Sequence, residues 1–183
     1  MGKTSLLLRL TEDRFDPSVT SIGVDFKVKE VKLSGGRAVK LQVWDAVGKS
    51  GSKRYTFTST CMRKAHAILF LYDISDPESW ESVPSWISEA EVSAPNALVR
   101  LLVGTKCDQD RKVQREQAEE LSDSAGLHSF HEVSAATGEG ISELFSALAT
   151  QVDKRLAEHK SFRNVQDTVD LQGSSGQKKR CCA

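Results

Sequence analysis

The chain has 183 residues, of which 39% are hydrophobic and 27% are charged, and its formal net charge at pH 7 is zero. This length suits one globular domain with a tail, and the balanced charge argues against a nucleic-acid-binding protein, which usually carries a basic excess. No apolar run is long enough to span a bilayer, and the leucine-rich start is a poor secretory signal because an arginine interrupts it. The four cysteines are therefore not predicted to form a disulfide framework.

The first part of the chain is predicted to form a short helix followed by an antiparallel hairpin. Residues 4–10 are rich in leucine and contain no Gly or Pro, as is typical of a helix. Residues 22–33 alternate apolar and polar side chains, which indicates a half-buried strand with a small irregularity near Glu30. A glycine-containing turn at 34–37 leads into residues 39–44, which are predicted to return as the second strand.

The rest of the chain alternates short apolar runs with helical patterns. The runs are 67–72, 98–103 and, more weakly, 129–133, and the helical patterns are 79–94, 114–125 and 141–158. Continuous apolar strands between helices indicate a parallel sheet covered on both faces, in which ligands bind beyond the carboxyl ends of the strands. The sequence therefore predicts an α/β fold with a mostly parallel sheet, helices on both faces and one antiparallel hairpin.

The last part of the chain is polar and has little apolar content, so we expect it to be a disordered tail. The predicted organisation is one domain over residues 1–158 and a tail over residues 159–183.

The chain begins with the end of a phosphate-binding motif. Gly2, Lys3 and Thr4, followed by Ser5, match the last positions of the pattern G-x-x-x-x-G-K-[ST], whose backbone N–H groups surround phosphates. The first half of the pattern and the strand that should precede it do not occur in this sequence. Three matching residues alone recur by chance, so the motif gains weight only from other nucleotide-binding elements further along the chain.

An acid and a glycine form the second element. Asp45 ends a predicted strand and Gly48 lies three residues later. An aspartate in this place can hold Mg²⁺, and a glycine amide can contact a terminal phosphate. Taken alone, the pattern is explained more simply by a strand-ending aspartate before a turn.

Two further segments point to guanine. Thr105, Lys106 and Asp108 follow the predicted strand 98–103, where a carboxylate can accept two N–H bonds from the guanine edge, a pair that adenine does not offer. The aliphatic stem of Lys106 can lie over the base. A last segment follows strand 129–133, where a backbone N–H can reach the guanine oxygen; its residues are Ser134, Ala135 and Ala136.

These elements, in this order, resemble the small GTPases. Within that group, residues 22–26 and 40–44 are similar to stretches that distinguish the Rab family, and residues 71–75 match more loosely. The resemblance covers residues 2–156 and the terminal cysteines. It implies a P-loop NTPase-like fold from which the first central strand and the first half of the P-loop are missing. It also implies a GTP/GDP-dependent switch in vesicle trafficking that uses Mg²⁺.

The resemblance assigns roles to individual residues. Lys3 would bridge the β- and γ-phosphates, and Thr4, Ser21 and Asp45 would hold Mg²⁺. Phe15 is similar to the aromatic residue that packs against the guanine, with a core contact at the end of the first helix as the alternative.

The departures from the family lie on the phosphate side. Lys49 occupies the position of the glutamine that orients the attacking water, and an ammonium group donates hydrogen bonds but accepts none. We therefore expect slow GTP hydrolysis, which the incomplete P-loop would impair further, so enzymatic activity is left open. Residues 46–53 and 61–65 also differ where regulators and effectors dock. A second interpretation is a non-hydrolysing pseudo-GTPase that acts as a membrane-tethered binding module.

The chain ends with Cys181, Cys182 and Ala183, which resemble the paired-cysteine endings that Rab geranylgeranyltransferase modifies. Two lipid groups give stable anchoring, and the basic residues 178–180 would add attraction to an anionic leaflet. The alternative is an exposed cysteine pair of no consequence. The resemblance implies attachment to cytoplasmic membrane faces with a cytosolic pool. It also implies exchange factors, GAPs, escort or GDI-type proteins and effectors as partners.

Overall fold

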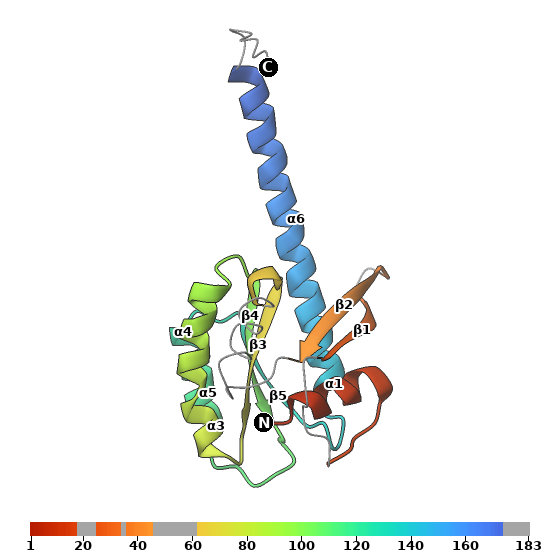
Figure 1. Ribbon diagram of the computed structural model, residues 1–183, viewed down its shortest axis with the longest axis vertical. Coiled ribbons are helices and arrows are strands. Elements are labelled where there is room, and N and C mark those ends of the chain that lie inside the picture. The colour runs from red at the N-terminus through yellow and green to blue at the C-terminus, as the bar shows by residue number, and fades with distance from the viewer. Residues whose placement is uncertain (18–24, 34–35, 46–61, 174–183) are drawn as a thin grey trace, which may run out of the picture.

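The computed structural model describes residues 1–17, 25–33, 36–45 and 62–173. Figure 1 shows a mixed α/β domain from which one long helix projects. The elements in chain order are α1 (Lys3–Glu12), β1 (Asp25–Lys32), β2 (Ala38–Asp45), β3 (Ala67–Asp73), α3 (Pro77–Glu81), α4 (Val83–Ser93), β4 (Val99–Thr105), α5 (Arg115–Ser124), β5 (Ser129–Val133) and α6 (Ile141–Gly173).

Strands β1 and β2 form the predicted antiparallel hairpin. Their ladder runs without interruption from the Asp25–Asp45 pair to the Lys32–Ala38 pair. Glu30 lies directly opposite Lys40 in this ladder, so the predicted irregularity near Glu30 is wrong. Opposite charges across a pair of strands favour this regular register.

Strands β3, β4 and β5 form the predicted parallel sheet, with β4 in the centre. The strand predicted at 129–133 coincides with β5. Among the described residues, the hairpin and this sheet are separate, and no strand pairs with both β2 and β3. The parallel three-stranded sheet and the antiparallel pair agree with the predicted α/β fold.

Helices cover both faces of the parallel sheet, as predicted. On one face, α3, α4 and α5 pack over β3 and β4 through a cluster that includes Phe70, Tyr72, Ile87, Leu102 and Ala118. On the other face, α1 and α6 pack over β4 and β5 through Leu6, Leu101, Val103, Leu144 and Phe145. Leu101, Leu102 and Val103 are fully buried and point alternately to the two faces, which explains the continuous apolar run that identified this strand.

Two helices differ from their predicted bounds. The single helix expected at 79–94 is two helices, α3 and α4, that meet at Ser82. Pro84 explains the break, because proline has no N–H to donate and fits only the first turn of a helix, which it occupies in α4. Helix α6 continues past residue 158 to Gly173, through the first part of the segment that we expected to be disordered. No Gly or Pro occurs between Ile141 and Gln172 to stop it.

None of the helices in the described part of the chain combines the length and the apolar character that crossing a bilayer requires.

Candidate functional site

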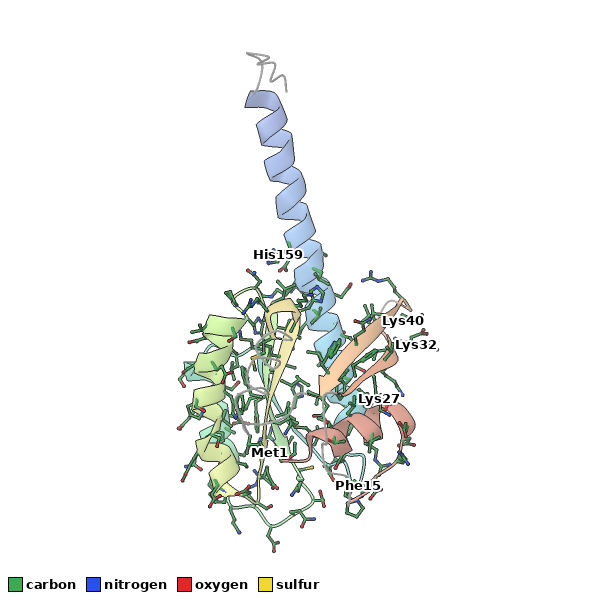
Figure 2. The ribbon with its side chains drawn as sticks, viewed as in Figure 1. Met1, Phe15, Lys27, Lys32, Lys40 and His159 are labelled. Atoms are coloured by element: carbon green, nitrogen blue, oxygen red, sulfur yellow. The ribbon has the colours of Figure 1, made fainter. Side chains whose placement is uncertain are left out.

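The predicted site residues that the structure describes gather at one end of the domain. This end contains the start of α1, the end of β2 and the carboxyl ends of β3, β4 and β5, where an α/β sheet places its ligands. Figure 2 shows Met1 and Phe15 at this end, whereas His159 on α6 lies at the opposite end. The candidate site and the chain leading to the tail therefore lie at opposite ends of the domain.

The start of α1 has the geometry of a phosphate-binding turn. Gly2 precedes the helix with φ 70° and ψ 24°, a left-handed conformation that favours glycine. Lys3, Thr4 and Ser5 form the first turn of the helix, where backbone N–H groups have no intrahelical acceptor and the helix dipole favours anions. No acidic residue occupies this turn to compete with a phosphate.

Two of the three residues expected to hold Mg²⁺ are in contact. The Thr4 hydroxyl donates a 2.5 Å hydrogen bond to Asp45 Oδ2, which brings α1 and the end of β2 together. Asp45 is 5% exposed, so its carboxylate lies inside the domain rather than in a solvated turn. A hydroxyl and a carboxylate are the hard oxygen ligands that Mg²⁺ prefers, so the residues present fit the ion.

The end of β4 is linked to both neighbouring segments. Thr105 is buried, and its hydroxyl oxygen lies 2.8 Å from the carbonyl oxygen of Tyr72 and 3.0 Å from that of Met1. Lys106 has φ 60°, which is uncommon for a residue with a side chain, and its ammonium lies 2.5 Å from Asp73 Oδ2. The two sides of the predicted site, at α1 and β4, therefore adjoin.

Asp73 is a buried carboxylate at the end of β3 that sequence analysis did not assign to the site. Burial opposes its ionisation, but hydrogen bonds from Lys106 and from the hydroxyl and backbone N–H of Ser75 outweigh burial and lower its pKa. The charged form therefore persists at neutral pH. The sequence signal that could have identified Asp73 is its position directly after the apolar run 67–72. In the structure it lies level with Thr105 in the parallel ladder.

Asp108 and the loop after β5 form the guanine side of the predicted site. Ser134 is fully buried, and its hydroxyl oxygen accepts hydrogen bonds of 3.1 Å from the N–H groups of Ala136 and Thr137. A hydrogen bond with Ser134, followed by one from Gln109, lowers the pKa of Asp108. Asp108 is itself exposed, so an ionised carboxylate faces solvent beside this loop.

Arg9 is a second residue that sequence analysis did not assign. It lies on α1, and its guanidinium donates to the carbonyl oxygens of Ala135 and Ala136 at 2.7 and 2.8 Å. The sequence offers one signal for this contact, which is an arginine inside a leucine-rich helical segment. The structure shows that the leucines around it are buried.

Phe15 lies beyond the end of α1 and is 42% exposed, so it does not make the core contact considered as an alternative. Its contact with a base stays a prediction. The remaining predicted site residues, Ser21, Gly48, Lys49, Cys181 and Cys182, lie outside the described residues.

Comparison with known proteins supports the same family. The Ras family model matches residues 1–154. The whole chain is 40% identical to the GTP-binding protein ypt2 of Schizosaccharomyces pombe, 90% of which is covered. It is 41% identical to the Ras-related protein Rab-13 of Rattus norvegicus over 83% of this chain and 74% of that protein. The whole chain is also 35% identical to the Ras-related protein RABD2a of Arabidopsis thaliana, over 91% of its length. The chain therefore belongs to the Ras family and, within it, to the Rab family of small GTPases.

Proposed function

We propose that the chain binds GTP and GDP with Mg²⁺ and acts as a nucleotide-dependent switch in vesicle trafficking. The observation that carries this proposal is the meeting of four distant segments at one end of the domain: the start of α1, Asp45, the loop that follows β4 and the loop that follows β5. Each segment supplies a group that a different part of a guanine nucleotide needs. The name of the relative ypt2 describes it as GTP-binding, which supports the same ligand here.

The roles follow the chemistry of the nucleotide. The N–H groups at the start of α1, with Lys3, would neutralise phosphate charge. Thr4 and Asp45, together with Ser21, would hold Mg²⁺, which supplies charge neutralisation between the phosphates. The ionised Asp108 would accept the N–H pair of guanine, and the loop at 134–136 would donate a backbone N–H to the guanine oxygen.

The same proposal includes a lipid anchor. Cys181 and Cys182 would carry geranylgeranyl groups, and α6 leads the chain away from the candidate site as far as Gly173 (Figure 1). An anchor beyond that point leaves the nucleotide end accessible to exchange factors, GAPs, GDI-type proteins and effectors. The protein would then cycle between cytoplasmic membrane faces and the cytosol.

A second candidate function is a membrane-tethered binding module that does not hydrolyse GTP. Lys49 favours it, because this residue cannot accept a hydrogen bond from the attacking water. The hairpin also offers a docking surface, since the side chains of Phe26, Val28 and Trp44 are about half exposed. The rings of Phe26 and Trp44 stack with centroids 4.9 Å apart. Exposed aromatic side chains of this kind are typical of interface centres.

Nucleotide binding by the purified chain tests the main proposal. A fluorescent GDP analogue should bind and be displaced by GDP and GTP, but not by ADP. Asp108→Asn should reduce the preference for guanine, because the amide cannot accept both N–H groups. Asp110→Asn is the matched control, since Asp110 is also exposed and lies two residues away. Failure of the unmodified chain to bind any guanine nucleotide contradicts the switch and leaves the binding module, for which Trp44→Ala should abolish partner capture.

A further inference from the structure

We propose that Arg9 is a positioning residue for guanine recognition: it holds the loop at 134–136 so that the Ala135 N–H is available to the base oxygen. This inference rests on the proposed function, because it assumes that the loop faces a guanine. It goes further by assigning part of the base selectivity to a side chain on the helix that begins at the phosphate side.

The contact is built from several hydrogen bonds. Nε of Arg9 donates to the carbonyl oxygen of Ala135 at 2.7 Å, and Nη2 donates to that of Ala136 at 2.8 Å. Nη1 lies 3.2 Å from both the carbonyl oxygen and Oδ1 of Asp13. The Arg9 side chain is only 17% exposed. A guanidinium held at all three nitrogens has one orientation, so it fixes the two carbonyl groups that it contacts.

The opposite side of the loop is fixed by Ser134. Its hydroxyl oxygen accepts from the N–H groups of Ala136 and Thr137. The N–H of Ala135 is then the amide of this loop that has no hydrogen-bond partner among the described residues. Arg9 donates to the Ala135 carbonyl and Ser134 accepts from the Ala136 N–H, so the peptide between Ala135 and Ala136 is held from both sides. This peptide directly follows the one that carries the Ala135 N–H, so fixing it restricts the direction of that N–H. An N–H fixed in direction and without an internal partner is suited to an acceptor on a ligand.

The planar fork of arginine is what this contact requires. Two successive carbonyl groups present acceptors side by side, and the parallel N–H groups of a guanidinium match them. A lysine in the same place keeps the charge but offers a single point of contact. Arg9→Lys therefore separates the orienting effect from the effect of charge.

The experiment measures the binding of three nucleotides to the full 183-residue chain by competition with a fluorescent GDP analogue. 6-Thio-GDP differs from GDP only at the base oxygen, where sulfur is a weak acceptor. IDP lacks only the 2-amino group and therefore reports on the Asp108 side. Arg9→Lys should weaken GDP binding about fivefold, the usual size of one net hydrogen bond. It should also bring the GDP to 6-thio-GDP affinity ratio close to one while leaving the GDP to IDP ratio unchanged.

Two further variants complete the test. Asp13→Gly removes the other side-chain partner of Arg9 and tolerates the positive φ of 50° at this position, so it should keep both ratios of the unmodified chain. Ala135→Pro removes the N–H itself. It should therefore weaken GDP binding and bring the GDP to 6-thio-GDP affinity ratio close to one, whether or not Arg9→Lys folds.

The outcomes are distinguishable. If the unmodified chain binds no guanine nucleotide, both the proposed function and this inference are wrong. If Ala135→Pro changes the 6-thio-GDP ratio but a folded Arg9→Lys variant does not, only the role of Arg9 is overturned. If the chain binds GDP and neither variant changes the ratio, the contact of the loop with the base oxygen is overturned as well.

Discussion

The hydroxyl of Thr4 donates a 2.5 Å hydrogen bond to the carboxylate of Asp45, although the two residues are 41 positions apart. The contact joins the first turn of α1 to the last residue of β2. Both residues are predicted from the sequence to hold Mg²⁺. Their proximity keeps two oxygen ligands together, so part of the coordination shell of a bound Mg²⁺ would already be formed before the ion binds.

Replacing Asp45 with Asn should therefore weaken the dependence of nucleotide binding on Mg²⁺. The amide keeps the shape of the carboxylate but loses the charge that attracts a hard cation. We expect a rise of about 10- to 100-fold in the Mg²⁺ concentration at which half of the slowing of GDP release is reached. GDP release measured across a magnesium titration gives this value. Asp123→Asn on the exposed face of α5 is the control, and an equal shift in both variants would contradict the assignment.

The sequence was sufficient for the fold where local patterns and tertiary packing agree. The strand predicted at 129–133 and the pairing of β1 with β2 are both confirmed. It was insufficient where one residue changes the backbone, as Pro84 does between α3 and α4. Helix α6 shows the opposite case, since polar composition predicted a tail while the absence of Gly and Pro allowed the helix to continue to Gly173.

The candidate site follows the same division. Residues such as Thr4, Asp45 and Asp108 could be proposed because their side-chain chemistry and their positions beside strands or helices are readable in order along the chain. Arg9 and Asp73 were missed because their roles consist of contacts across the fold. Arg9 reaches carbonyl groups more than a hundred residues away, and an arginine on a helix predicts no such partner.

The Asp73–Lys106 pair should stabilise the domain in a pH-dependent way. Asp73→Asn should lower the free energy of unfolding at pH 7 by about 1–3 kcal/mol, towards the lower end because Lys106 is half exposed. Since the pKa of folded Asp73 lies below its ordinary value, this stabilisation is fully present above about pH 4 and is lost as the pH falls further. The two proteins should therefore converge in stability only at strongly acidic pH.

Urea unfolding at pH 7 and at pH 3 measures this difference. Asp110→Asn, at an exposed carboxylate, is the control. A difference between Asp73→Asn and the unmodified chain that is the same at both pH values would show that the pair does not depend on ionisation.

Lys49 should limit GTP hydrolysis. Lys49→Gln restores a side chain that both donates and accepts, so it can orient a water molecule. We expect single-turnover hydrolysis to accelerate at least about tenfold, which is a modest share of what general-base positioning supplies. Lys53→Gln changes the same charge nearby and should have no effect. Unchanged turnover after Lys49→Gln would contradict the assignment of slow hydrolysis to this residue.

The paired cysteines should determine membrane attachment in cells. Burying a lipid chain contributes about 0.8 kcal/mol per CH₂, and one chain alone binds reversibly whereas two signals anchor stably. Cys181→Ser and Cys182→Ser singly should therefore shift part of the protein from the membrane to the soluble fraction, and the double variant should shift nearly all of it. Mass spectrometry of the C-terminal peptide should detect two geranylgeranyl groups in the unmodified chain. Cys107→Ser, at a half-buried cysteine within the domain, is the control. If the double variant remains on membranes, the anchor lies elsewhere and the cysteine pair has no such role.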